Sequence, residues 1–96
     1  MLTHIVCWKY NAEATEEQRN YHISRLQNLK NEIDCVKSLN VGSDVLHLDR
    51  SFDTGLVATF ADKSALDEYT VHPKHQEVVA VGRAISEKVV SVDFVD

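Results

Sequence analysis

The chain has 96 residues, of which 44% are hydrophobic and 26% charged, the balance of a folded domain rather than of a disordered, collagen-like or coiled-coil chain. Its 15 acidic and 10 basic residues give a formal net charge of −5, so the positive field that attracts nucleic acid or anionic membranes is missing. The apolar runs are far shorter than the roughly 18 residues that span a bilayer. We therefore expect one domain over residues 1–96 that binds neither nucleic acid nor membrane.

Cysteine usage indicates the compartment. Cys7 and Cys35 lie in apolar contexts without a C-x-x-C spacing, and the N-terminus lacks the basic region, apolar run and cleavage site of a signal peptide. We expect a cytoplasmic protein with both thiols reduced.

Residues 2–10 are rich in β-branched and aromatic side chains and predict the first strand. The period of two separates this strand into a face with Leu2, His4, Val6, Trp8 and Tyr10 and a face with Thr3, Ile5 and Cys7. Because both faces are largely apolar, both must be covered.

The segment Thr15–Gln18 has the form of a capping box and predicts the start of a helix. The following apolar spacings of four, three and four place one stripe on this helix, formed by His22, Leu26, Leu29 and Ile33. We expect this stripe to cover the first strand.

Two further strands follow the helix. The segments Cys35–Val41 and Val45–Leu48 predict one extended strand, interrupted by a bend at Gly42. After a polar turn, residues 56–60 form a short strand that is apolar on both faces.

The last third of the chain predicts a broken helix and a final strand. Asp62 or Ser64 can cap a short helix, and Pro73 suits the first turn of a second helical piece that starts near His72. Residues 89–95 form the last strand. The order βαββαβ predicts an α+β, ferredoxin-like fold with a four-stranded antiparallel sheet and the helices on one face.

This arrangement leaves the second face of the sheet uncovered, with apolar residues such as Ile5, Val57 and Val90 on the strands. An exposed apolar patch of this extent is typical of an interface. We expect a homodimer in which two sheets face each other and close into a dimeric α+β barrel.

Several segments together carry a family resemblance, namely Thr3–Tyr10, Asp49-Arg50, Leu56–Phe60 and the Y-x-x-H-P-x-H block of Tyr69–His75. In these segments the chain resembles the stress-responsive A/B barrel (Dabb) family from end to end. The resemblance implies the same dimeric barrel. It also implies varied functions, because many members are known only as stress-induced proteins while one plant member is a cyclase.

The resemblance to that cyclase implies catalytic roles for His4, Tyr69 and His75. The chain departs from the cyclase along the first helix, where His22, Ile23 and Leu26 replace aromatic residues, and at Ser86, which replaces a tryptophan. The substrate therefore need not be the same.

The residue types allow the same chemistry without the family. A neutral imidazole can remove a proton from a carbon acid, and a tyrosine hydroxyl can donate to an enolate oxygen. For His4, a buried histidine bonded to a neighbour is an equally open interpretation, and His72-Pro73 can simply start a helix. His72 and His75 have no third ligand at a recognisable spacing, so we expect neither a metal nor a cofactor.

We expect His4, Tyr69 and His75 to meet in a pocket between sheet and helices, whose walls include Val6, Trp8, His22, Leu26, His72 and Val78. The predicted function is the binding of a small apolar or aromatic molecule. Two alternatives stay open: lyase or cyclase chemistry by His/Tyr acid-base catalysis, and a structural stress protein without a ligand.

Overall fold

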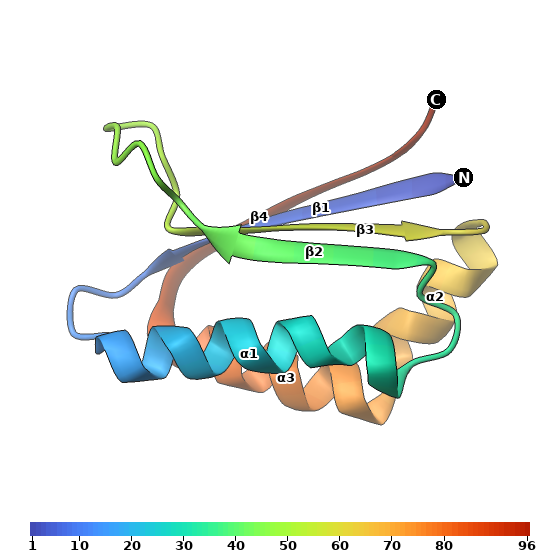
Figure 1. The fold of residues 1–96 in the computed structure, drawn as a ribbon, viewed down its shortest axis with the longest axis horizontal. Helices are drawn as coiled ribbons and strands as arrows, with labels where there is room; N and C mark the ends of the chain where they lie inside the picture. Colours follow the sequence, from blue (N-terminus) through green and yellow to red (C-terminus); the bar gives the residue numbers. More distant parts are fainter.

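The fold has two layers, a four-stranded sheet and three helices on one of its faces (Figure 1). The computed structural model describes residues 1–96. Its elements are β1 (Leu2–Tyr10), α1 (Glu16–Glu32), β2 (Ser38–Ser43), β3 (Thr54–Phe60), α2 (Lys63–Val71), α3 (Pro73–Ile85) and β4 (Ser86–Val95).

All strand pairs of the sheet are antiparallel, and the strand order is β2-β3-β1-β4. The first and last strands are therefore neighbours, and β1 lies between β3 and β4. In the register, Ile5 stands opposite Val57 on one side and Val92 on the other. This is the ferredoxin-like βαββαβ topology, and the predicted fold is confirmed with its second helix divided into α2 and α3.

The predicted helix starts are confirmed by their caps. Thr15 caps α1 in a reciprocal capping box with Gln18. Asp62 accepts a hydrogen bond from the Ala65 N–H at the start of α2. His72 ends α2 and caps α3, whose first residue is Pro73. The two helices are separate because proline has no N–H to donate in a helix interior.

The core lies between the helices and the inner face of the sheet. The α1 stripe predicted from the sequence is buried there, and Leu29 is fully enclosed. The largest apolar side chains with almost no exposed surface are Tyr69, Phe60, Leu29, Leu56 and Val78. This layer of packed side chains fixes the position of every inner-face residue on β1.

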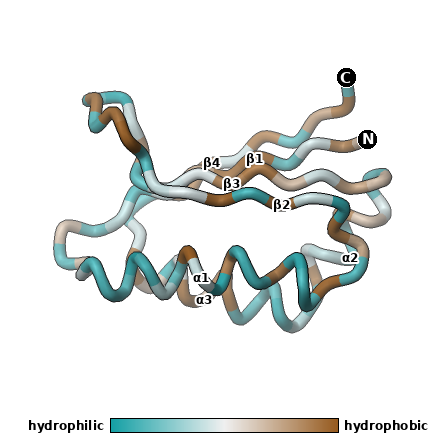
Figure 2. Tube along the Cα trace, in the orientation of Figure 1, coloured by the Kyte–Doolittle hydropathy of each residue, from teal (hydrophilic) through white to brown (hydrophobic).

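The prediction of a strand over Val45–Leu48 is wrong. β2 passes through Gly42, opposite Gly55, without a bend and ends at Ser43, and the residues that follow form a loop. Asp44 accepts a hydrogen bond from the His47 N–H, and His47 has a positive φ of 54°, which interrupts an extended chain. The loop rises on the side of the sheet opposite the helices (Figures 1 and 2), and it carries two exposed apolar side chains, Val45 (82%) and Leu46 (67%).

No helix covers the outer face of the sheet (Figure 1). Its apolar side chains are correspondingly exposed, 43% for Val57, 53% for Val92 and 41% for Phe94. The helices themselves are short or polar, and none has the length and apolar character needed to cross a bilayer.

Candidate functional site

The inner layer contains a partly enclosed cavity of about 330 Å³ between the sheet and helices α1 and α3. Its volume lies at the lower end of the roughly 300–1,000 Å³ range of small-molecule sites. The residues that line it are His4, Val6, Trp8, Leu26, His75, Val78, Val79, Arg83, Val89 and Ser91. The cavity therefore combines an apolar wall with two imidazoles, a guanidinium and a hydroxyl.

His4 reaches this cavity from β1 and is held by a carboxylate on the last strand. Its Nδ1 is hydrogen-bonded to Oδ1 of Asp93, its register partner on β4. Because a carboxylate only accepts, Nδ1 carries a proton, and in the neutral imidazole the lone pair is then on Nε2. Asp93 thus selects the tautomer in which His4 has a basic nitrogen available.

His75 reaches the cavity from the first turns of α3. Its Nδ1 donates to the backbone carbonyl of Thr70 at 3.1 Å, so its free lone pair is also on Nε2. Burial lowers the pKa of His75, and the nearby His4 and His72 lower it further, against the opposite effect of the Thr70 hydrogen bond. At neutral pH, His75 is therefore an uncharged imidazole.

Tyr69 lies against both imidazoles but does not line the cavity itself. Its ring centroid is 4.3 Å from that of His75 and 6.1 Å from that of His4. The side chain is 2% exposed, and burial, with a smaller effect of Cys35, raises its pKa. The structure thus brings the three predicted catalytic residues together, and their catalytic roles stay predictions.

Four of the six predicted wall residues line the cavity: Val6, Trp8, Leu26 and Val78. The sequence alone did not single out Val79, Arg83, Val89 and Ser91, nor Asp93 behind His4. A signal for Asp93 was available, since pairing the first strand with the last in an antiparallel register puts His4 opposite Asp93. No comparable signal marked Arg83, which depends on how α3 faces the sheet.

His22 is buried beside the cavity wall rather than in it. Its Nδ1 is 2.8 Å from the Tyr10 hydroxyl, and its ring stands edge-on to Trp8 with the centroids 5.0 Å apart. Burial lowers the pKa of His22 to about 4, so this imidazole is neutral at physiological pH. Its position supports Trp8, which in turn forms part of the cavity wall.

His72, the remaining predicted wall residue, is a helix cap. Its Nδ1 accepts a hydrogen bond from the Lys74 N–H at 3.1 Å, which satisfies one free donor at the start of α3. The structure does not bring His72 to the cavity. No group of three or more His, Cys, Asp or Glu side chains is placed to hold a metal ion.

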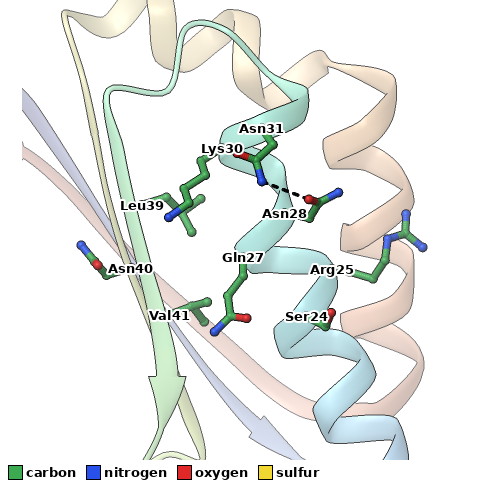
Figure 3. A pocket seen from close by; sticks show the side chains of 9 residues that line it. All are labelled: Ser24, Arg25, Gln27, Asn28, Lys30, Asn31, Leu39, Asn40 and Val41. Atoms are coloured by element: carbon green, nitrogen blue, oxygen red, sulfur yellow. Dashed lines mark hydrogen bonds between the residues drawn. The ribbon is translucent and has the colours of Figure 1, made fainter.

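A second, larger depression of about 490 Å³ lies between α1 and the edge strand β2 (Figure 3). Amides dominate its walls, with Asn31 donating to Asn28, and Leu39 and Val41 are its apolar residues. The Arg25 guanidinium at its rim is already bonded to Tyr21 and Glu77. None of the predicted catalytic residues reaches it, so the smaller inner cavity is the candidate site.

Known proteins resemble the chain over nearly its whole length. A stress-response A/B barrel domain-containing protein of Arabidopsis thaliana is 31% identical over 95% of this chain and 82% of its own length. Olivetolic acid cyclase of Cannabis sativa is 27% identical over 97% of this chain and 94% of its own length.

A solved structure agrees with the fold. A dimeric ferredoxin-like protein of unknown function from Thermobifida fusca superposes with a TM-score of 0.90 at 24% identity, over 99% of this chain and 90% of that one. The Stress responsive A/B Barrel Domain family matches residues 2–96. The chain therefore belongs to the stress-responsive A/B barrel family, in agreement with the resemblance found in its sequence.

Proposed function

We propose that this chain forms a homodimer in which each subunit binds a small apolar or aromatic molecule in its inner cavity. The observation that carries the proposal is the cavity itself, which lies beside the cluster of buried apolar side chains. Six apolar residues line it, so an apolar or aromatic ligand gains free energy by leaving water.

Trp8 offers a direct test because it is the one tryptophan of the chain and lines the cavity. In a ¹⁵N-labelled sample, the single indole N–H resonance reports on this wall alone. We expect naphthalene-2-methanol, a neutral aromatic probe, to shift that resonance in a saturable way.

A cavity-filling variant supplies the control. Val79→Phe adds a ring at the cavity wall, whereas Val71→Phe adds the same ring at an exposed position of α2. Val79→Phe is expected to abolish the shift and Val71→Phe to leave it unchanged. A saturable shift that survives Val79→Phe would place the ligand elsewhere and overturn the proposal.

The homodimer is supported by the outer face of the sheet, where Val57, Val90, Val92 and Phe94 are each at least 40% exposed. A second copy of the same face would cover these side chains, and the Thermobifida fusca relative is described as dimeric. The loop after β2 rises on this same side (Figure 1), and its exposed Val45 and Leu46 extend the surface available to a partner.

Light scattering tests the dimer. We expect twice the mass of the chain at micromolar concentration, and Val90→Asp is expected to split or unfold the dimer, because an unpaired charge in a dry interface costs several kcal/mol. Val71→Asp on the helical side should leave the mass unchanged. A stable, folded wild-type monomer at this concentration would contradict the homodimer.

Acid-base catalysis on a carbonyl substrate is the second candidate function, and the hydrogen bond between His4 and Asp93 specifically favours it. A carboxylate that fixes the tautomer of a histidine leaves a basic nitrogen oriented for proton transfer. His75 has the same free Nε2, and Tyr69 lies against both rings, so its hydroxyl is the candidate donor to a developing enolate oxygen. The olivetolic acid cyclase relative supports this class of chemistry by its name.

Deuterium exchange isolates the proton-transfer step. In D₂O, a base removes an α-proton of phenylacetone and the enolate takes up deuterium, which proton NMR measures. We expect the wild type to accelerate exchange, and we expect His75→Ala to lower the exchange rate roughly 10²–10⁴-fold. Tyr69→Phe should lower the exchange rate about 10²–10³-fold, because it removes the hydroxyl that donates to the enolate oxygen. His47→Ala, which removes an exposed loop imidazole, is the control, and equal losses in His47→Ala and His75→Ala would contradict a catalytic site.

A further inference from the structure

We propose that the cavity has an anion-binding end, formed by Arg83, and that its ligand is an amphipathic molecule carrying a carboxylate. This inference rests on the proposed function and narrows it, since it states which group the ligand must carry. The observation behind it is the Arg83 guanidinium, an exposed side chain that lines the cavity without a protein partner, in a wall that contains no carboxylate.

The two arginines of α1 are bonded within the chain, whereas Arg83 and the loop residue Arg50 are not, and of these two only Arg83 lines the cavity. Arg19 donates to the Ala14 carbonyl and lies over the Tyr10 ring, and Arg25 is bonded to Tyr21 and Glu77. Arg83 makes no side-chain hydrogen bond and has no carboxylate within 4 Å, although the chain carries 15 acidic residues. Its five donors therefore stay available to an incoming group.

The other lining residues do not compensate this charge. No Asp or Glu lines the cavity, and the carboxylate of Asp93 lies behind His4, more than 4 Å from the Arg83 guanidinium. His75 is neutral because burial lowers its pKa. Arg83 is thus the one permanent charge at the cavity, and a ligand that brings an anion there forms a charge-assisted pair whose planar geometry matches a carboxylate.

The topology separates this end from the imidazole end. His75 and Arg83 are eight residues apart on α3, which places their backbones roughly 12 Å from each other along the helix axis. On the sheet, Val89 stands opposite Trp8 and Ser91 opposite Val6, whereas His4 stands one step further along, opposite Asp93. A ligand with its carboxylate at Arg83 would direct its apolar body along Val6 and Val78 toward the imidazoles.

A purely structural role for Arg83 predicts something different. Arg83 lies in the last turn of α3, where a cation stabilises the free carbonyls and the negative end of the helix dipole. In that role, removal of the charge lowers the thermal stability without distinguishing one ligand from another. A preference between two ligands of the same shape is therefore the informative readout.

The experiment compares 3-phenylpropanoate with 3-phenylpropanamide, two probes of nearly equal shape of which only the first is charged. Binding is followed through the Trp8 indole resonance and by calorimetry in wild type, Arg83→Gln and Arg50→Gln. Arg50 is exposed in the loop after β2 and does not line the cavity, so Arg50→Gln is the control that removes the same charge elsewhere. Thermal unfolding of each variant checks that the fold is retained.

We expect wild type and Arg50→Gln to bind the carboxylate about tenfold more tightly than the amide. Arg83→Gln should remove that preference by weakening the carboxylate about tenfold while leaving the amide unchanged. Equal affinities of both probes in wild type, or an equal loss of both in Arg83→Gln, would overturn the anion site and leave the proposed function standing. If neither probe nor naphthalene-2-methanol binds, the proposed function fails and the anion site with it.

Discussion

The two faces of this sheet share the same four strands but differ in chemistry. On β1, the inner face presents His4, Val6 and Trp8, and every one of them lines the cavity. The outer face presents Thr3, Ile5 and Cys7, and their register neighbours on β4 are valines and Phe94. Titratable side chains with directed hydrogen bonds thus gather inside, and aliphatic side chains gather outside.

This difference follows from the period of two along a strand, which points successive side chains to opposite faces of the sheet. Neighbouring residues of one strand serve different surfaces, so a substitution at one position need not disturb the other face. The inner face positions polar groups in a dry environment, whereas the outer face offers non-directional apolar area for association. We therefore infer that ligand chemistry belongs to the inner face and assembly to the outer face.

The strongest contrast is expected on β3. Phe60 is fully buried on the inner face, and Phe60→Ala should lower the free energy of unfolding by about 3–5 kcal/mol through lost contacts and a new cavity. Val57 is 43% exposed in the single chain, so Val57→Ala should act through dimerisation alone. Denaturant unfolding at two protein concentrations distinguishes them, because the Val57→Ala effect alone should change with concentration. Equal, concentration-independent losses would contradict the assignment of the faces.

The buried histidine on the inner side should make stability depend on pH. The pKa of His22 is lowered to about 4, below the ordinary value of 6.5. Between these pH values the unfolded chain binds a proton that the folded chain does not, so stability falls as pH falls through this window. The full effect is about 3 kcal/mol, to which the lowered pKa of His75 adds in the same direction.

A matched variant isolates the contribution of His22. His22→Gln keeps an acceptor near the Tyr10 hydroxyl but cannot titrate, so its loss of stability between pH 7 and 4 should be smaller than that of wild type. His47→Gln, at an exposed loop position, should leave the pH dependence unchanged. Parallel curves for wild type and His22→Gln would show that His22 is not buried as a neutral group.

The smallest expected effect concerns the close approach of α3 to α1. A Cβ on Gly82 would lie 2.7 Å from Nε2 of His22 and 3.2 Å from Nε1 of Trp8. Gly82→Ala should therefore destabilise the protein by about 1–2 kcal/mol, although alanine favours a helix by about 1 kcal/mol over glycine. Ala80→Gly, an exposed position on the same helix, gives the propensity effect alone by thermal unfolding. A stabilised Gly82→Ala variant would contradict the packing of α3 on His22.

Much of the fold could be predicted because its signals are local. The capping box at Thr15, the His72-Pro73 break and the two faces of β1 each depend on residues within one turn or one strand. The error at Val45–Leu48 has the same origin, since this segment has the apolar character of a strand. Whether such a segment pairs is decided by its partner, and the β2–β3 register ends at Ser43 and Thr54.

The candidate site was predicted only in part because its remaining residues depend on distant contacts. Asp93 is 89 residues from His4 along the chain and meets it only through the β1–β4 register. Arg83 and Ser91 have no local pattern that marks them as cavity residues, since their role depends on the packing of α3 against β4. His22 lies on the helical stripe that the sequence predicts, but its ring is bonded to Tyr10 and does not line the cavity.

Methyl NMR of valine and leucine residues during a titration with 3-phenylpropanoate tests the central claim most directly, because both faces of the sheet are observed in one experiment. We expect saturable shifts at the cavity residues Val6, Leu26 and Val89 and none at the outer-face residues Val57 and Val92. Shifts confined to the outer face, or spread equally over both faces, would contradict it.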